Sequence, residues 1–187
     1  DKMKNRKKSI IIFFLILIFL SCGKKENTKN ESENKNNIEQ IEEQMITFKD
    51  KSIEKVINDF EVNSKKNKIE INKFENLKYE NQNFYKAEII TKEDSNYTIS
   101  YQGIDIKGLA LKVGTVSNSD LGIIEDMVVN LIEVSDKRIM EDEARILYAQ
   151  LLSDIKEDKL SNSIKYKNGI TYAIQVERTG VLIFSAQ

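Results

Sequence analysis

The sequence predicts an α+β domain in which an antiparallel sheet of meander strands is covered on one face by helices. Apolar residues recur with helical spacing in residues 38–64 and 121–155, and with the two-residue spacing of strands in residues 68–113 and 164–186. An Asn-Gly pair at 168–169, the strongest short-range hairpin signal, lies in the second strand region. Helices and antiparallel strands in this order are typical of helices packed on one face of a sheet.

The first helical region, residues 38–64, is predicted to form one long helix or two successive helices. Its apolar residues follow a helical spacing that repeats on a shifted phase. Because the pattern has few apolar steps, we interpret it as a helix lying on its own sheet, and a partner-binding coiled coil is the alternative. The residues concerned are Ile38, Ile41, Met45 and Phe48, followed by Ile53, Val56, Ile57 and Phe60.

The strand region that follows, residues 68–113, is predicted to form three or four antiparallel strands. Apolar and polar residues alternate through it, which is the pattern of strands with one buried face. Gly108 lies where the alternation changes parity, and this predicts a bulge. The alternating residues are Ile69 and Ile71, then Tyr85, Ala87 and Ile89, then Tyr97, Ile99 and Tyr101, then Ile104, Ile106, Leu109, Leu111 and Val113.

Two further helices are predicted between residues 117 and 159. Ser117 and Asp120 have the spacing of a capping box ahead of a strongly apolar run. The second helix has acidic residues at 141–143 near its start and Lys156 and Lys159 near its end, and both signs favour the helix dipole. The apolar faces comprise Ile124, Met127, Val128, Leu131 and Ile132 in the first helix, and Ala144, Leu147, Tyr148, Leu151 and Ile155 in the second.

The chain is predicted to end in three strands. Asn168 and Gly169 close a hairpin, and a turn at 178–180 leads into a last strand, residues 181–186. Because that last run is apolar on both faces, we expect it to be central in its sheet. The two helix-then-meander halves are similar in length, as a degenerate duplication would make them, but no residue-level repeat supports a duplication.

The N-terminus has the organisation of a secretory signal peptide. A basic head that contains Lys4 and Arg6 is followed by an uninterrupted apolar run, Ile10–Leu20. This run is shorter than the ~20 residues that a membrane-spanning helix needs, and it fits the apolar core of a signal peptide. Ser21 then supplies a small residue before the cleavage point.

The cysteine that follows this run indicates how the protein is anchored. Cys22 is the only cysteine in the chain. Together with the apolar run it resembles a bacterial lipoprotein signal, although Phe19 and Leu20 depart from the residues most usual there. The resemblance implies that residues 1–21 are removed as a signal peptide and that Cys22 is lipidated as the first mature residue. The alternatives are a plain secretory signal and an uncleaved anchor.

The mature chain is predicted to be a tethered domain. Residues 22–37 comprise the lipidated cysteine and a disordered tether, which contains no apolar residue after Cys22 and cannot offset the entropy of ordering. Residues 38–187 form a single α+β domain. The membrane is then one partner, through the lipid on Cys22, and the expected location is the cell envelope. By the same resemblance, Gly23 after the cysteine implies the outer membrane rather than the inner one in a cell with two membranes.

Composition narrows the chemistry of the folded domain. The precursor has 29 basic and 30 acidic residues, and removal of residues 1–21 takes away five basic residues and one acidic residue, which leaves a net charge of −5. That charge argues against nucleic acid as a partner. The chain has no histidine and its one cysteine is assigned to the lipid, so imidazole and thiolate catalysis and zinc sites are excluded. We expect no metal and no cofactor.

Five tyrosines on the predicted strands are the candidate binding residues. On an open sheet face their rings could stack on a sugar or clasp a peptide. The alternative is that they pack beneath the helices with their hydroxyl groups reaching water, and the parity that Tyr97 and Tyr101 share with Ile99 favours this for those two. The five are Tyr85, Tyr97, Tyr101, Tyr166 and Tyr172.

Clustered carboxylates are the visible candidates for catalysis. Residues 125–126 and 141–143 are acidic, and acid–base work on a glycan requires two acids held across a cleft. Their positions on a solvated helix face and in a first helical turn favour a solvent and dipole role instead. We therefore expect a non-enzymatic binding domain with a protein or cell-wall partner. A carboxylate-dependent enzyme acting on envelope glycans and a small-ligand carrier are the alternatives.

Overall fold

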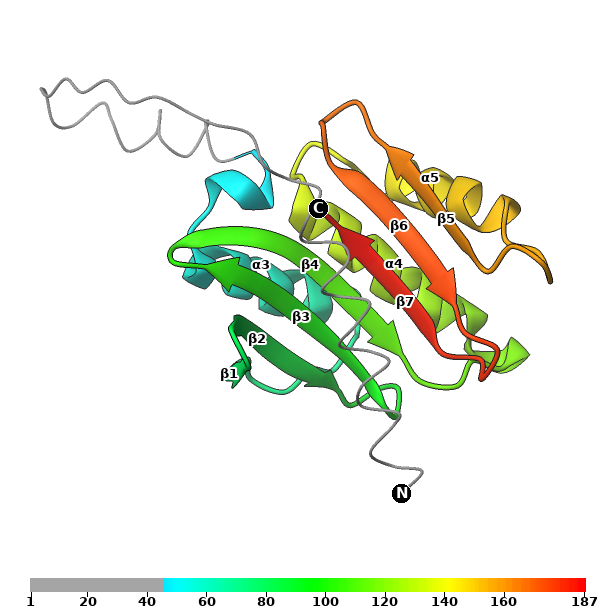
Figure 1. Cartoon of the computed structure of the whole chain (residues 1–187), viewed down its shortest axis with the longest axis horizontal. Coiled ribbons are helices and arrows are strands. Elements are labelled where there is room, and N and C mark those ends of the chain that lie inside the picture. Colours follow the sequence, from blue (N-terminus) through cyan, green and yellow to red (C-terminus); the bar gives the residue numbers. More distant parts are fainter. Residues whose placement is uncertain (1–45) are drawn as a thin grey trace, which may run out of the picture. The chain divides into compact units, whose positions relative to one another are not determined.

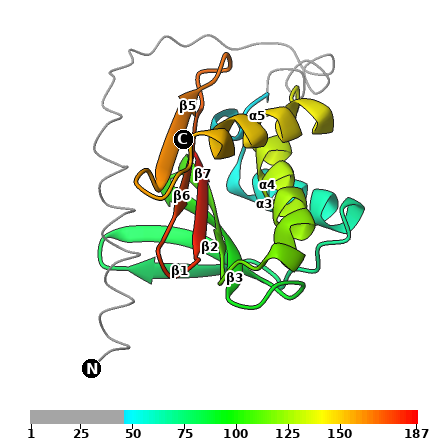
Figure 2. The same cartoon turned by 90° about the vertical axis from the view of Figure 1, so that its right-hand side faces the viewer.

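A computed structural model describes residues 46–187, which form one seven-stranded antiparallel sheet with helices on one face (Figures 1 and 2). The strand order is β1-β2-β3-β4-β7-β6-β5. This confirms the predicted α+β class and its meander strands. The elements are η1 (Phe48–Asp50), α3 (Ile53–Lys66), β1 (Glu75–Tyr79), β2 (Gln82–Ile89), β3 (Ser95–Gln102), β4 (Asp105–Val113), η2 (Asn118–Asp120), α4 (Leu121–Ser135), α5 (Glu141–Ser153), β5 (Ser161–Lys165), β6 (Thr171–Val176) and β7 (Leu182–Ala186).

The first helical region contains a short 3-10 turn, η1, followed by α3. The break between them lies at Ser52, whose Oγ accepts a hydrogen bond from the Lys55 backbone N–H at 3.3 Å and so caps α3. Residues 38–45 of the predicted helix lie outside the described residues. The side chains of Val56 and Phe60 are fully buried, as the helical spacing predicts.

The first meander differs from the prediction at its start. Ile71 makes only an isolated bridge to Ile89, and the first strand is β1, which is not among the predicted strands. All five β1 residues are exposed, so neither face of β1 is buried. The predicted bulge is confirmed, because the β3–β4 register shifts between Ser100, which lies opposite Gly108, and Tyr101, which lies opposite Ile106.

Helix α4 is the most buried helix, and it carries a polar network into the core. The hydroxyl group of Tyr97 donates to the Met127 carbonyl at 2.9 Å. Asn130 Nδ2 donates to the same hydroxyl at 3.1 Å and to Ser64 Oγ of α3 at 2.8 Å. This network joins α3, α4 and β3 at the centre of the fold. It satisfies the Tyr97 and Ser64 hydroxyl groups and Asn130 Nδ2, which would be costly to bury alone, whereas Asn130 Oδ1 is buried without a hydrogen-bond partner.

The end of α5 differs from the prediction. The helix ends at Ser153, and Lys156 and Lys159 lie beyond it, bridged to each other through their backbones. They are therefore not in the last helical turn, where a favourable contact with the helix dipole was expected. The acidic residues Glu141, Asp142 and Glu143 do occupy the first turn, as predicted.

The last three strands agree with the prediction. Gly169 and Gly180 both have positive φ, 80° and 82°, in the turns that flank β6. Strand β7 lies between β4 and β6 at the centre of the sheet, and all its residues are buried. The expectation of a central last strand is thereby confirmed.

The two meanders meet through their last strands, because β4 pairs antiparallel with β7. Within this pairing Ala110 lies opposite Ser185. Tyr97 lies opposite the residue after Ala110, and Tyr172 lies opposite the residue after Ser185. The meanders are thus arranged as if about a two-fold axis through the Ala110–Ser185 pair, with Tyr97 and Tyr172 in equivalent positions. A degenerate duplication would produce this arrangement, and it stays a hypothesis; β1 has no counterpart in the second meander.

Candidate functional site

Two of the five candidate tyrosines belong to the core. Tyr97 and Tyr172 are fully buried between the sheet and α4, so neither is available to the open-surface binding considered for it. Tyr97 bonds to α4 as described, and the Tyr172 hydroxyl group lies 2.6 Å from Ser135 Oγ of the same helix. Burial raises the pKa of both phenols, that of Tyr172 to about 12 despite opposing hydrogen bonds from Ser135 and Asn168. Both tyrosines connect the sheet to α4.

Tyr166 lies in the turn after β5 rather than on a strand. Its hydroxyl group donates to a carboxylate oxygen of Glu143 on α5, and Lys167 Nζ lies 2.5 Å from the same oxygen. Hydrogen bonds from Lys167 and then Tyr166 hold the pKa of Glu143 below its usual value, although burial opposes them. Tyr166 therefore connects the β5–β6 turn to α5 and does not present a free ring face together with the other tyrosines.

Tyr85 and Tyr101 form a half-buried pair at the edge of the core. Tyr85 lies opposite Ile99, and Tyr101 is two residues further along β3, so both point to the helix side of the sheet. Their ring centroids are 5.5 Å apart. Asn76 of β1 connects the two hydroxyl groups, because Tyr101 donates to Asn76 Oδ1 at 3.0 Å and Asn76 Nδ2 donates to Tyr85 at 3.3 Å. The predicted burial of Tyr101 under the helices is incomplete, since its side chain remains partly exposed.

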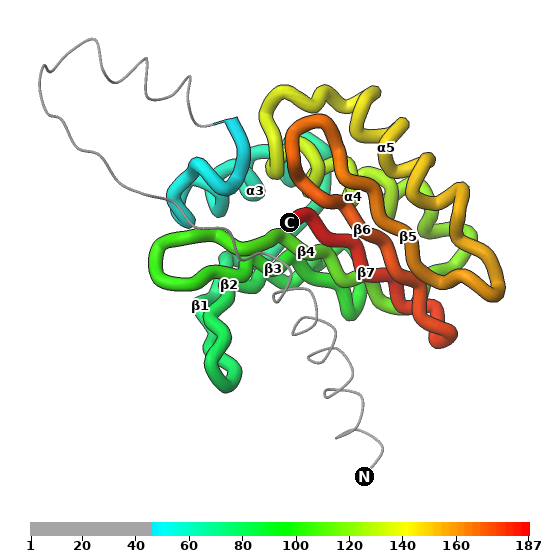
Figure 3. The backbone as a smooth tube through the Cα atoms, turned by 45° about the horizontal axis from the view of Figure 1, so that its top comes forward, coloured from blue at the N-terminus to red at the C-terminus, as the bar shows by residue number. Residues whose placement is uncertain are grey.

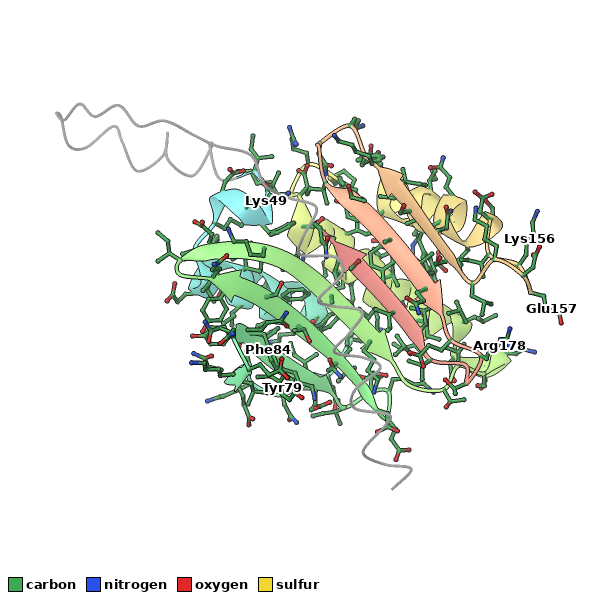
Figure 4. The ribbon with its side chains drawn as sticks, viewed as in Figure 1. Lys49, Tyr79, Phe84, Lys156, Glu157 and Arg178 are labelled. Atoms are coloured by element: carbon green, nitrogen blue, oxygen red, sulfur yellow. The ribbon has the colours of Figure 1, made fainter. Side chains whose placement is uncertain are left out.

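The opposite side of the same strands carries further apolar side chains. Leu77 lies opposite Phe84, and Tyr79 follows Leu77 on the same face of β1. The side chains of Leu77 and Tyr79 are 38% and 41% exposed, which is high for large apolar groups on a strand. Figure 4 shows Tyr79 and Phe84 together at the β1–β2 end of the sheet.

These residues lie on both faces of the sheet at its β1 end, and we call them together the β1-end surface. The β1–β2 hairpin that carries most of it extends beyond the rest of the sheet (Figure 3). This surface offers tyrosine rings, an amide side chain and an open strand edge. Such groups suit the binding of a ligand, by stacking and hydrogen bonding, rather than the cleavage of its bonds. The β1-end surface comprises Asn76, Leu77, Tyr79, Phe84, Tyr85 and Tyr101.

Sequence reasoning found Tyr85 and Tyr101 but missed the β1 half of this surface. The hairpin turn between β1 and β2 contains no glycine, and Glu80 adopts the left-handed conformation there, with φ 52°. An Asn-Gly or Asp-Gly pair would have indicated the hairpin. The alternation of Leu77 and Tyr79 with Lys78 was the available signal.

Three of the five clustered carboxylates contact one arginine. Arg145 of α5 contacts Glu125 at 3.2 Å, Asp126 at 2.8 Å and Glu141 at 2.9 Å. The hydrogen bonds that Arg145 donates to Asp126 and Glu141 raise the pKa of its guanidinium, which therefore stays charged. Within residues 46–187, no group of three or more Asp, Glu, His or Cys side chains is placed to hold a metal ion, and no helix there is long and apolar enough to cross a membrane.

The predicted lipidation site, Cys22, lies outside the described residues, as do the signal peptide and the tether. Comparisons of the chain with protein-family models, with curated proteins and with solved structures found no match.

Proposed function

We propose that the protein is a lipid-anchored, non-enzymatic binding module of the bacterial cell envelope that binds its partner at the β1-end surface. The observation that carries the proposal is that the exposed side chains of Leu77 and Tyr79 and three half-buried aromatic rings lie at one end of the sheet. The outer side of the edge strand there, β1, pairs with no other strand among residues 46–187. Exposed apolar groups that gather in one place are typical of interaction sites, and tyrosine is enriched at such sites. The lipid expected on Cys22 would hold this surface near the membrane.

The charged residues of the helices support a binding role over a catalytic one. Acids that act on glycans need one carboxyl group that can be protonated near neutral pH. Four carboxylates of the two acidic clusters contact cations. Arg145 contacts Glu125, Asp126 and Glu141, and Lys167 contacts Glu143. A neighbouring cation favours the charged carboxylate and opposes its use as an acid.

Photo-cross-linking in the producing cells tests the binding surface. We expect a photoreactive benzoyl-phenylalanine in place of Tyr79 to give cross-linked adducts of the full-length protein, because Tyr79 is exposed within the β1-end surface. The matched control carries the same photoreactive residue in place of Ile146, which is 59% exposed and lies on α5, outside the β1-end surface. Adducts at position 79 and none at position 146 support the proposal. No adducts at 79, or equal yields at both positions, would contradict it.

The anchor is tested separately by the change Cys22→Ala. We expect the variant to remain as the uncleaved precursor without lipid, because the thiol that would carry the lipid is gone. Incorporation of radiolabelled fatty acid and the mobility of the protein on a denaturing gel measure both effects. Ser21→Ala, which keeps a small residue beside the cysteine, serves as the control and should be lipidated like the parent. Continued labelling of the Cys22→Ala variant would refute the assignment.

A further inference from the structure

We infer that the β1-end surface binds an extended polypeptide segment, which adds to the edge of β1 as an eighth strand of the sheet. This inference rests on the proposed function and specifies the chemistry of its partner. Strand β1 is the outermost strand at its end of the sheet and pairs only with β2 among the described residues. The N–H and C=O groups on its outer side are therefore available to a further strand, as in other cases of strand addition.

The two edges of the sheet are not equivalent. Strand β5, at the other end, is polar apart from Ile164, and Asn162 Nδ2 donates to the Leu151 carbonyl of α5 at 3.0 Å, which ties that edge to a helix. Each edge strand carries a lysine, Lys165 on β5 and Lys78 on β1, so edge charge does not distinguish the two. Strand β1 presents Leu77 and Tyr79 beside its open edge. The β1 edge is thus the one suited to a partner strand.

The edge is held in place before any partner binds. Asn76 of β1 is hydrogen-bonded to Tyr85 of β2 and to Tyr101 of β3, so its side chain links β1 to both of these strands. A preorganised edge loses less conformational entropy when a peptide binds to it. The tyrosine pair therefore acts here as a support that positions β1, in addition to the surface that its rings present.

The two faces of β1 determine the pattern of the incoming segment. Side chains of an added strand would lie beside Leu77 and Tyr79 on the open face and beside Asn76 and Lys78 on the helix side. The partner segment should therefore alternate apolar residues on one face with polar residues on the other. An amphipathic extended segment of a protein has this pattern.

Charge adds a further requirement. Lys78 lies opposite the uncharged Asn83, whereas Glu75 lies opposite Lys86 of β2. A partner strand can supply an acidic residue beside Lys78, and opposite charges across strands are favourable. We therefore expect an acidic residue on the polar face of the partner segment.

The same charges argue against a second copy of this chain as the occupant. Antiparallel pairing of two β1 strands about a two-fold axis keeps each residue on its own face of the combined sheet. Glu75 and Lys78 are three residues apart and lie on opposite faces, so no such register brings them together. A register centred on Leu77 places Lys78 opposite Asn76, so Lys78 gains no acidic neighbour from a second copy. A heterologous strand with an acidic residue at that position is the better fit.

The test uses a fluorescent synthetic peptide of about nine residues, long enough to cover β1, which alternates valine with glutamate and threonine. Its binding to the purified mature protein is measured by fluorescence anisotropy. Two further peptides carry N-methyl groups on the odd or on the even residues, which removes the N–H groups on one side of the strand or the other. We expect one of the two to bind at least about tenfold more weakly than the parent peptide, because it loses several backbone hydrogen bonds, and the other to bind like the parent.

Variants of the protein test the charge requirement. Lys78→Glu should weaken binding of the parent peptide several-fold and restore it for a peptide with lysine in place of glutamate. Lys165→Glu on the β5 edge is the matched control and should leave both affinities unchanged. Equal binding of both N-methylated peptides, an unchanged affinity in the Lys78→Glu variant, or no binding of the parent peptide would overturn the inference.

Two outcomes separate this inference from the function on which it rests. Cross-linked adducts at position 79 together with failure of the peptide experiments would leave the binding surface in place and reject strand addition. A dimer of the free protein that the change Leu77→Lys dissociates, measured by sedimentation, would show that a second copy occupies the edge and would also overturn the inference.

Discussion

The change Phe60→Ala is expected to lower the free energy of unfolding by about 3–5 kcal/mol. The Phe60 side chain is fully buried on the sheet-facing side of α3. Its ring centroid lies 4.8 Å from that of Tyr97 and 5.6 Å from that of Phe74. Truncation to alanine loses these contacts and leaves a cavity that neighbouring strands can fill only in part. Because a domain of this size is stable by about 5–15 kcal/mol, this is a large fraction of the total.

Urea denaturation followed by far-ultraviolet circular dichroism measures this change. Ile104→Ala is the control, since Ile104 is 88% exposed and its truncation should alter the free energy of unfolding by no more than about 0.5 kcal/mol. A loss below about 1.5 kcal/mol in the Phe60→Ala variant would mean that α3 contributes little to the core. That result would contradict the packing described for the first half of the fold.

The change Asp136→Ala should cost about 2–4 kcal/mol through the loss of charged hydrogen bonds. The Asp136 side chain is 1% exposed at the end of α4. Its Oδ1 accepts from the backbone N–H and the Nε of Arg138, both at 3.0 Å, and its Oδ2 accepts from Arg138 NH2 at 2.7 Å. Asn168 Nδ2 donates to Oδ2 at 3.0 Å from the β5–β6 turn. Asp136 thus joins the α4–α5 corner to the second meander.

Asp136 should also make stability depend on pH in the acid range. Burial opposes its charge, but the hydrogen bonds from Arg138 and then Asn168 outweigh burial and place its pKa below the ordinary value. The stability that the carboxylate contributes is therefore fully present above the pKa of the unfolded chain, about 3.9. It is lost as the pH falls through the lower pKa of the folded state.

Denaturation of the wild-type and Asp136→Asn proteins across this pH range tests the prediction. The difference in free energy of unfolding between them should be constant near neutral pH and should shrink below about pH 4. Asp105→Asn is the control, because Asp105 is 68% exposed and its pair with Lys107 is expected to add little. A difference that does not change with pH would show that the Asp136 charge is not what stabilises the corner.

Much of the fold could be predicted because its signals are local. The apolar faces of α4 and α5, the turn at Gly169 and the parity change at Gly108 follow from the spacing of residues along the chain. Strand β1 was missed because its alternation, Leu77 and Tyr79 around Lys78, is short, because neither of its faces is buried, and because its turn has no glycine. The sequence also did not decide whether the helix is interrupted at Ser52, because two successive helices and one long helix have the same period.

The candidate site was predicted only in part. The two-residue period correctly placed Tyr97 and Tyr101 on the face of their strand that carries Ile99, but it does not say which part of that face a helix covers. In the structure α4 covers Tyr97, whereas Tyr101 reaches past the helices to Asn76. Tyrosine is common in strands, but Tyr166 lies in the turn after β5, where its hydroxyl group donates a hydrogen bond to Glu143 of α5.

By itself, the sequence determined the α+β class, the order of helices and strands, and the prediction of an anchor at Cys22, because each depends on residues close together in the chain. The tertiary structure alone decided which end of the sheet is left uncovered. The uncovered end depends on the pairing of β4 with β7, which sets the strand order, and on where the helices pack on the sheet. Both the strand pairing and the helix packing are contacts between segments distant in the sequence. The exposed edge of β1, from which the partner is inferred, is a consequence of that packing.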